Sequence, residues 1–475
     1  MCKRYCYQIS VLLLLCTAIG CKKFVSVSPP PTEVESSGIF NNDANAVAAQ
    51  TAIYSQMQSS AESLLMSLRN GLMADELKNY CSNALEIEYY TNSLLSTKVS
   101  SPWIDAYSYI YQANAVINGL QKYSGVSAVS KQQLTGEAEF IRAFWNFYLV
   151  NCYGAVPLIT TTDYTVNAVA QPASTSTIYT QIIADLLDAE NKLNVNYVDA
   201  TDSVVTGDRI RPTKWAAAAM LARVYLYTGA NESAEQQSSL VIDGSNNQYQ
   251  LCQTLDSVFL MNNTEAIWQL PPVQPSSNLA VPDGEFFIIS KTPGGSRVYN
   301  NATISTQLLN SFEPGDLRAS HWIGDYQHGG INYYYPYKYK LLQSNDLAEY
   351  TVVLRLAEQY LIRAEARAQQ GNISGTSGAL ADLNVIRNRA GLPVYSGATD
   401  QQSVLAAILH ERQVELFAEW GHRWFDLIRT KNIDNVMGTV TPLKGGSWSA
   451  DWALYPIPFS EIASDPKLTQ NPGYN

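Results

Sequence analysis

The sequence predicts a mainly helical protein in which a frame of helices supports a loop-rich region with short strands. Three observations predict this fold class. Hydrophobic and aromatic residues recur every three or four positions over most of the chain, which is the period of an α-helix. Between residues 250 and 350 that period is lost, and proline and glycine pairs interrupt a segment rich in aromatic residues. The composition, with 46% hydrophobic and 15% charged residues among 475, excludes a disordered chain.

The first twenty residues have the features of a lipoprotein export signal. Lys3 and Arg4 form a basic start, and residues 11–16 are an apolar stretch too short to cross a membrane as a helix. Small residues then precede Cys21, as lipidation of the thiol and cleavage ahead of it require. We therefore predict that residues 1–20 are removed and that Cys21 carries the lipid. The alternative is an ordinary signal peptide followed by an incidental cysteine.

The N-terminal half begins with three predicted helices. A helix over 43–58 opens after Asn42, a residue type that caps helix N-termini. A second helix, over 103–117, repeats aromatic and aliphatic residues at spacings of three and four. A third, over 131–152, carries an aromatic stripe and is closed by Gly154. All three patterns predict amphipathic helices that pack on a common core.

Further along, residues 177–193 form a clean amphipathic pattern, whose acids, including Asp185, we expect to face outward. A last long helix is predicted over 403–419. The tail, residues 454–475, is proline-rich, and we predict that it is irregular.

Two stretches have the pattern of helical hairpins. The first pairs 213–227 with 232–242, and the second pairs 352–370 with 378–389; a glycine follows the first helix of each pair. In the first hairpin, small residues alternate with large ones where a partner helix must approach. This spacing is typical of tetratricopeptide-like packing, although no strict 34-residue period is present.

The net charge argues against nucleic acid as a partner. It is −11 for the whole chain and becomes about −13 when Lys3 and Arg4 leave with the signal. Such a chain repels phosphate backbones and anionic lipid. Three cysteines remain in the mature part apart from Cys21, and their spacing matches no metal site. We expect Cys81, Cys152 and Cys252 to be small buried thiols with at most one disulfide among them.

Seven motifs follow one another along most of the chain. They are GEAEFIRAFWNFYLV at 136–150 with YGAVPL at 153–158, TKWAAAAMLARVYLYTG at 213–229, LRLAEQYLIRAEA at 354–366, LNVIRNRAG at 383–391, HERQVELFAEWGHRWFDLIR at 410–429, LYPIP at 454–458 and LTQNPGY at 468–474. With these motifs, the chain resembles the SusD/RagB family of outer-membrane nutrient-binding lipoproteins.

The resemblance implies a fold and a function. The fold is α-helical, with four tetratricopeptide-like hairpins that support a loop-rich half. The function is that of a non-catalytic, lipid-anchored protein of the outer membrane, exposed at the cell surface. It captures oligosaccharide, or in some members peptide, and delivers it to a TonB-dependent transporter of the SusC type. We divide the chain accordingly into a signal peptide (1–20), an N-terminal SusD-like region (21–245) and a C-terminal SusD/RagB region (246–475) with the ligand-facing loops.

No catalytic constellation is evident, and we predict neither a cofactor nor a metal. Glu411, Glu415 and Glu419 lie four residues apart on one helical stripe. A hydrolase would instead hold two carboxyls across a cleft, so we predict ion pairs that lock helices together. His321 and His328 lack the spacing of a metal site, and we interpret them as polar loop residues.

Aromatic side chains are the better candidates for binding. Tyrosine is abundant, with 30 residues against 12 phenylalanines, and it combines a flat apolar face with a hydrogen-bonding edge. That combination suits a sugar ring, which has an apolar face and a polar rim. Two clusters lie outside the scaffold helices. The predicted ligand-binding residues are Tyr80, Asn83, Tyr89 and Tyr90 in the first cluster, and Trp322, Tyr326, Tyr333, Tyr334 and Tyr335 in the second.

The other prominent aromatic residues are assigned to the core. Alternation along 333–340 places four tyrosines on one side of an extended segment, and we expect the last two to pack inward. The residues assigned to the core are Tyr337, Tyr339, Trp103, Trp145, Trp215 and Trp424. Two other functions remain open at this point: a lipid-anchored glycoside hydrolase, and a module of helical hairpins that binds only another protein.

Overall fold

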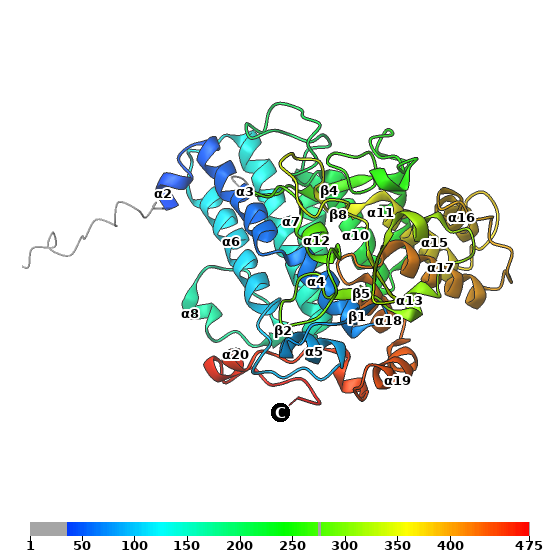
Figure 1. Cartoon of the computed structure of the whole chain (residues 1–475). Helices are drawn as coiled ribbons and strands as arrows, with labels where there is room; N and C mark the ends of the chain where they lie inside the picture. The colour runs from blue at the N-terminus through cyan, green and yellow to red at the C-terminus, as the bar shows by residue number, and fades with distance from the viewer. Residues whose placement is uncertain (1–35, 274–276, 475) are drawn as a thin grey trace, which may run out of the picture.

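The computed structural model describes residues 36–273 and 277–474, and helices dominate it (Figure 1). The predicted signal peptide, 1–20, and the predicted lipidation site Cys21 lie outside the described residues. Among the residues that are described, no helix is long and apolar enough to cross a membrane. The mainly helical fold class is therefore confirmed, and the few strands are short.

The elements alternate along the chain as follows. The helices of the first half are α2 (Ser36–Ile39), α3 (Asp43–Ser59), α4 (Glu62–Met73), α5 (Ala84–Tyr90), α6 (Trp103–Lys122), α7 (Ala128–Tyr153), α8 (Tyr164–Asn167), α9 (Thr175–Lys192), α10 (Lys214–Thr228) and α11 (Asn231–Ile242). Those of the second half are α12 (Pro282–Phe287), α13 (Thr306–Leu309), α14 (Leu317–His321), α15 (Leu356–Gln369), α16 (Ala379–Arg389), α17 (Gln401–Leu416), α18 (His422–Arg429), α19 (Ile433–Leu443) and α20 (Phe459–Ser464), with 3-10 turns η1 (Leu255–Ser257) and η2 (Ala450–Ala453). The strands are β1 (Leu77–Asn79), β2 (Val156–Pro157), β3 (Pro172–Ala173), β4 (Ala266–Leu270), β5 (Ala302–Ile304), β6 (Ile323–His328), β7 (Ile331–Pro336) and β8 (Thr351–Arg355).

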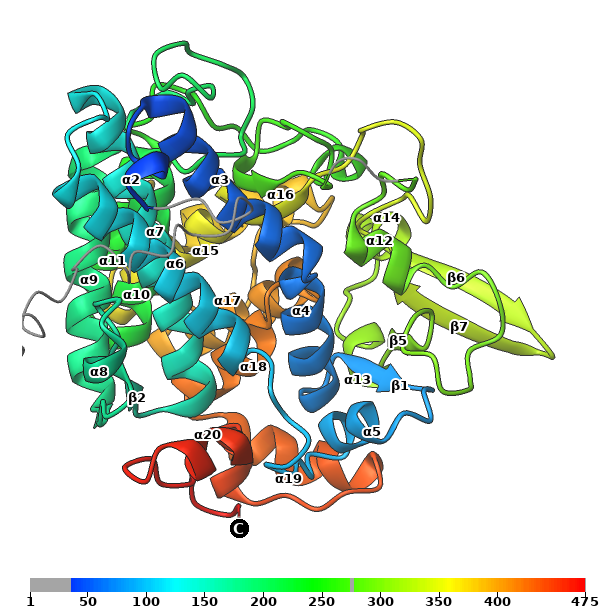
Figure 2. The same ribbon diagram turned by 90° about the vertical axis from the view of Figure 1, so that its left-hand side faces the viewer.

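The helices of the first half pack side by side, as Figure 2 shows for α3, α6, α7 and α9. The central helix, α7, is buried over nearly its whole circumference, which accounts for its aromatic stripe. Asp185 on α9 does not face outward as predicted. It is buried, and its two oxygens accept hydrogen bonds of 2.8 and 2.7 Å from Arg142 on α7. The prediction was wrong because the sequence pattern of the helix is the same whether an acidic residue is exposed or is buried in an ion pair with arginine.

The helical hairpins are present. Helices α10 and α11 pack on each other, as do α15 and α16, and α15 also contacts α10, α11 and α17. The alanines at 216–219 are completely buried and let neighbouring helices approach closely. The division of this array into four tetratricopeptide-like units remains a prediction.

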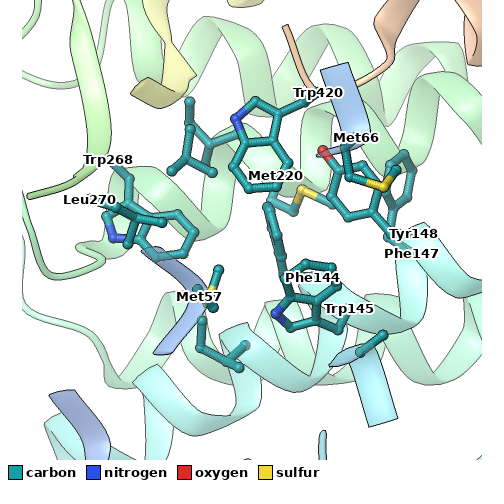
Figure 3. Close-up of a cluster of buried hydrophobic side chains, with 14 of the residues drawn as sticks. Met57, Met66, Phe144, Trp145, Phe147, Tyr148, Met220, Trp268, Leu270 and Trp420 are labelled. Atoms are coloured by element: carbon teal, nitrogen blue, oxygen red, sulfur yellow. The ribbon is translucent and has the colours of Figure 1, made fainter. Parts of the chain in front are cut away.

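The main core is built around aromatic rings (Figure 3). The ring of Phe144 on α7 lies edge-on to Trp268 on β4, with centroids 5.6 Å apart, and edge-on to Trp420, at 5.3 Å. The core thus joins α7 to segments of the second half. Five core assignments made from the sequence are confirmed by exposures of at most 7%, at Trp103, Trp145, Trp215, Trp424 and Tyr339. The sixth, Tyr337, is only partly buried, at the edge of a small cluster with Tyr335.

The strands form small antiparallel pairs that join distant segments. Strand β1 pairs with β5, β4 pairs with β8, and β6 and β7 form a hairpin. The predicted helix 352–370 was wrong over its first four residues, which belong to β8. Both β4 and β8 are fully buried, so their apolar runs resemble a buried helix in sequence.

The predicted helix 403–419 also ends earlier, at Leu416. Ala418, Trp420 and Gly421 have positive φ, which ends the helix and starts α18 in a new direction. The three cysteines of the described residues, Cys81, Cys152 and Cys252, are buried and free, as expected for small core thiols.

Candidate functional site

The β6–β7 hairpin projects from the helical frame (Figure 2). Its two strands are joined by Gly329 and Gly330, whose φ values of 59° and 79° fit the two-residue turn that matches the twist of a hairpin. The register places Tyr326 directly opposite Tyr333. Because side chains alternate along a strand, this cross-strand pair shares one face, and Tyr334 lies on the other.

The two predicted aromatic clusters meet at this hairpin. The ring of Tyr80 lies edge-on to Tyr333, with centroids 5.4 Å apart, and Tyr333 lies 6.4 Å from Tyr326. All three pack against Ile288 and Ile289, which are buried. Tyr333 is only 7% exposed, so it supports its neighbours, whereas Tyr80 and Tyr326 are partly exposed. Residues far apart in sequence thus form one aromatic surface.

A lysine lies on the same surface. Lys78 is exposed, and its Nζ lies 4.7 Å from the centroid of the Tyr80 ring, the distance of a cation–π contact. A hydrogen bond to Tyr80 raises the pKa of Lys78 above its ordinary value. Tyr90, at the end of α5, is partly buried close by, and the Lys444 ammonium lies 5.4 Å from its ring centroid. We call Lys78, Tyr80, Tyr90 and Tyr326 the tyrosine–lysine surface.

A cavity of about 200 Å³ adjoins this surface. Lys78, Tyr90 and Lys444 line it together with Asp75 and Thr306. The ammonium of Lys444 donates hydrogen bonds to the last carbonyls of α4 and of the residue that follows it, and its burial lowers the pKa to about 7. Of the residues lining this cavity, the lysines supply the positive charge.

The segment 290–301 was not identified from the sequence, yet it borders the surface. Its backbone is hydrogen-bonded to the residues that follow β1, since the Tyr80 N–H donates to Asn301 O at 2.8 Å. Ser82 N–H donates to Gly295 O, also at 2.8 Å. The segment therefore forms one side of the tyrosine–lysine surface.

Two asparagines hold this segment in shape. Asn300 Nδ2 donates to Ile288 O at 2.5 Å, and the Asn301 side chain bonds Gly294 N and, at 2.5 Å, Arg297 O. They hold in place Arg297, which is exposed, and Tyr299, which is 50% exposed and whose ring lies 5.3 Å from that of Phe286. The sequence contained a signal for this arrangement: an asparagine pair next to a tyrosine, after a proline and two glycines.

Four predicted ligand contacts are wrong because their side chains are buried: Tyr333, at 7% exposure, and the three residues Trp322, Tyr89 and Tyr335. Trp322 and Tyr89 are both 0% exposed; Trp322 donates from Nε1 to Leu255 O at 3.0 Å, and Tyr89 packs against Tyr455. Tyr335 is 8% exposed and lies against Gly324, at which a Cβ would be 2.4 Å from its ring. The position of an aromatic residue in or beside a loop does not show whether other segments cover both faces of its ring. Trp322 and Tyr89 belong to the main hydrophobic core, and Tyr335 belongs to the small cluster at the hairpin.

The other predicted residues are accessible. Asn83 is partly exposed and caps α5, accepting a hydrogen bond from Leu85 N at 2.9 Å. Tyr334 is partly exposed on the opposite face of the hairpin from Tyr333. Neither is in ring contact with Tyr80, so they flank the tyrosine–lysine surface.

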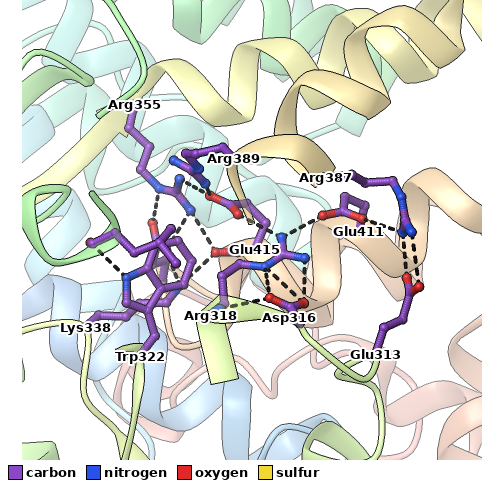
Figure 4. Close-up of polar contacts among 12 residues, drawn as sticks. Glu313, Asp316, Arg318, Trp322, Lys338, Arg355, Arg387, Arg389, Glu411 and Glu415 are labelled. Carbon is purple, nitrogen blue, oxygen red and sulfur yellow. Dashed lines mark hydrogen bonds and ion pairs between the residues drawn. The ribbon is translucent and has the colours of Figure 1, made fainter. Parts of the chain in front are cut away.

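The carboxylate stripe of α17 is a buried ion-pair network, as predicted (Figure 4). Glu415 is 0% exposed and pairs with Arg355 at 2.6 Å, with Arg318 at 2.9 Å and with Arg389. Burial opposes its ionisation, but the three arginines hold the pKa of this carboxyl well below its ordinary value. Glu411 and Glu419 are buried in the same network. Glu411 pairs with Arg318, and Glu419 pairs with Lys338 and Arg355. The stripe joins α15, α16 and α17 to the loop-rich half.

The two loop histidines do not come together. His321 Nδ1 lies 2.9 Å from Asp256 Oδ2, whereas His328 stacks on Tyr326 with centroids 6.4 Å apart. Within 36–273 and 277–474 there is no group of three or more His, Cys, Asp or Glu side chains that could hold a metal ion.

A larger cavity, of about 1000 Å³, lies elsewhere, among α10, α15, α17 and α18. Its tyrosine, Tyr227, is covered by the Arg429 guanidinium, 5.3 Å from the ring centroid. Arg429 is itself paired with Glu365. None of the ligand-binding residues predicted from the sequence lines this cavity, so we place the candidate site at the tyrosine–lysine surface, where Tyr80 and Tyr326 lie.

Comparisons with known proteins cover nearly the whole chain. A family model described as "SusD family" matches residues 247–474, and one described as "Starch-binding associating with outer membrane" matches residues 27–226. "SusD-like protein P2" of Formosa agariphila is 26% identical over 98% of this chain and 99% of its own length. "Starch-binding protein SusD" of Bacteroides thetaiotaomicron is 31% identical over 26% of this chain and 21% of its own.

Solved structures have the same fold. A "Laminarin binding SusD-like protein" superposes with a TM-score of 0.74 at 25% identity, covering 91% of this chain and 100% of its own. A SusD homolog from Bacteroides thetaiotaomicron gives a TM-score of 0.79 at 21% identity, covering 93% and 99%.

Proposed function

The chain belongs to the SusD/RagB family, and from this premise we propose that it is a lipid-anchored receptor that captures glycan without altering it. It holds the glycan on the tyrosine–lysine surface and delivers it to a TonB-dependent transporter of the SusC type. Cys21 would carry the anchor, and the protein would face the cell exterior from the outer membrane.

The observation that carries this proposal is the meeting of Tyr80 and Tyr326 on one partly exposed surface. Both rings are partly exposed, and polar groups border them: Lys78 lies over the Tyr80 ring, His328 stacks on Tyr326, and the phenol oxygens and Asn83 are close by. A pyranose ring presents the complementary combination, so it can lie on a tyrosine while its hydroxyls bond to the rim. A shallow surface of this kind orders little of the ligand and predicts weak affinity.

Delivery to a transporter does not require tight binding. A receptor held at the mouth of a barrel raises the local concentration of its ligand, and weak binding permits release. The carboxylates that a hydrolase would need are, in α17, buried in ion pairs with arginine. We therefore assign binding, not hydrolysis, to this protein.

The experiment is calorimetric titration of the mature chain with a panel of glycans and peptides. We expect at least one glycan to bind and Tyr80→Ala to weaken it about tenfold, the effect of losing an aromatic platform of about 1–2 kcal/mol. The matched control is Tyr164→Ala, because Tyr164 is 79% exposed on α8, outside the surface. Absence of binding to every glycan, or equal losses in the two variants, would refute the proposal.

Anchoring and partnership have separate tests. Cys21→Ala should move the protein from the membrane fraction to the soluble fraction, because the lipid is its only predicted anchor. A SusC-like barrel should co-purify with the wild-type protein from solubilised outer membranes. A variant that stays in the membrane fraction, or a preparation with no barrel, would contradict the corresponding part of the proposal.

A further inference from the structure

Many basic side chains in the interior of this protein pair with carboxylates. Arg142 pairs with Asp185 at 2.7 Å, and Arg223 pairs with Glu358 at 2.6 Å. Lys78 differs, because none of the described carboxylates lies within ion-pair distance of its ammonium, although the chain carries a net charge of −11. A cation left without a counter-ion at the binding surface of an acidic protein is available to a ligand.

The ammonium of Lys78 is also held in position. Its contact with the Tyr80 ring, at 4.7 Å, fixes the end of a flexible side chain beside the aromatic platform. The same tyrosine raises its pKa, so the group stays charged at neutral pH. Because Lys78 is exposed, an incoming anion does not have to displace a protein carboxylate.

The adjoining cavity adds a second lysine. Lys78 and Lys444 line the same space of about 200 Å³. Asp75 also lines it, but its two oxygens accept hydrogen bonds of 2.8 and 2.7 Å from Arg423. Its charge is therefore compensated. Lys444 donates to three backbone carbonyls and has a pKa of about 7, so Lys78 supplies the free positive charge of the cavity. This space admits a charged substituent of a sugar.

A third cation extends the surface along the segment 290–301. Arg297 is exposed, has no described carboxylate within ion-pair distance, and is positioned through its backbone carbonyl by Asn301 and by the Cys81 thiol. Arg297 therefore lies on a segment that is hydrogen-bonded, through Asn301 O and Tyr80 N–H, to the segment that carries Lys78 and Tyr80.

We propose that the ligand of the tyrosine–lysine surface is an anionic glycan, whose carboxylate or sulfate ester group pairs with Lys78 while a sugar ring lies on Tyr80. Arg297 would meet a second charged unit of the same polymer. This inference rests on the proposed function and narrows its ligand to sugars that carry negative charge. Uronic acids and sulfated sugars share the chemistry that Lys78 recognises, and the experiment separates them.

The test titrates the full mature chain with three probes: an oligogalacturonate, a κ-carrageenan oligosaccharide and a neutral laminari-oligosaccharide. Titrations are made at about 50 mM and about 300 mM NaCl, across which exposed charge pairs are progressively screened. We expect one of the two acidic probes to bind at least tenfold more tightly than the neutral one. We also expect its affinity to fall with salt.

The decisive variant is Lys78→Gln, and its matched control is Lys122→Gln. Lys122 also lies over a tyrosine ring, 5.2 Å from the centroid of Tyr123, and is also exposed without a carboxylate partner, but it ends α6, away from the surface. We expect Lys78→Gln to weaken binding of the acidic probe about tenfold and to reduce its salt dependence. Lys122→Gln should leave both unchanged.

The outcomes separate the two proposals. If the neutral probe binds and Lys78→Gln has the effect of Lys122→Gln, the anionic ligand is refuted while glycan binding stands. If no probe and no other glycan binds, the proposed function fails and this inference fails with it. Binding of oligogalacturonate but not of the carrageenan probe would assign a carboxylate, and the reverse would assign a sulfate ester.

Discussion

The buried ion-pair network around Glu415 leads to a specific prediction about stability. Glu415→Gln removes one negative charge and leaves the shape of the side chain almost unchanged. The carboxylate is completely buried and accepts hydrogen bonds of 2.6 Å from Arg355 and 2.9 Å from Arg318, in addition to its pair with Arg389. Neutralising it leaves three buried guanidinium groups facing an amide.

The magnitude follows from the cost of an uncompensated buried charge. Breaking a buried ion pair by removing one partner costs about 3–5 kcal/mol. The amide oxygen of glutamine still accepts one hydrogen bond, so we expect the lower part of that range, about 3 kcal/mol. The free energy of unfolding should fall by that amount at pH 7, where the low pKa of Glu415 keeps the wild-type group ionised.

The assay is urea unfolding followed by tryptophan fluorescence and by circular dichroism. Glu232→Gln is the control, because Glu232 is exposed on α11 and accepts a single long hydrogen bond, of 3.4 Å, from Gln236; its effect should stay within about 0.5 kcal/mol. A loss below about 1 kcal/mol for Glu415→Gln would refute the structural role of the network. Loss of a glycan-hydrolysing activity in a folded Glu415→Gln protein would do the same, in favour of catalysis.

Three further predictions concern other parts of the molecule. Burial, with Asp105 nearby, raises the pKa of Glu62 to about 9, so the stability that this group contributes is full below about pH 4.5 and is lost as the pH rises through 9. The urea midpoint of Glu62→Gln should therefore fall less than that of the wild type between pH 6 and pH 9, and parallel curves would contradict this. Asn301→Ala should free the segment 290–301 and weaken glycan affinity severalfold with little change in the urea midpoint, whereas unchanged affinity would remove that segment from the site. Gly119→Ala should cost about 1–3 kcal/mol in urea unfolding, because its Cβ would lie 2.0 Å from the Phe40 ring, and a neutral effect would show that this ring is free to move.

Much of the helical frame was predictable because each helix repeats its buried residues with a single period. The predicted bounds of α7, α10, α11 and α16 differ from the observed ones by at most three residues. The errors fall where buried polar or extended segments imitate another pattern. Asp185 imitated an exposed acid, and the first residues of 352–370 imitated a helix.

The site was predictable only in part. Composition and the absence of helical period located Tyr80 and Tyr326, because partly wet tyrosines outside the scaffold are suited to binding. The burial of Trp322 depends on η1 and on Lys338, 4.8 Å from its ring centroid, and nothing in its local sequence reveals either contact. Tyr299 was missed because its position depends on hydrogen bonds from the side chains of Asn300 and Asn301 to backbone groups. Such bonds leave no periodic pattern of hydrophobic residues in the sequence.

The pairing of β1 with β5 has a consequence for how this protein can change. Lys78 faces Thr303 across that pair, so the tyrosine–lysine surface draws three of its residues, Lys78, Tyr80 and Tyr90, from the predicted N-terminal region and one, Tyr326, from the predicted C-terminal region. Exchanging either region with that of a relative, shortening it or duplicating it would disrupt the pairing of β1 with β5. New specificities are therefore expected to arise by substitution of individual exposed side chains near this strand pair, and not by exchange of whole regions.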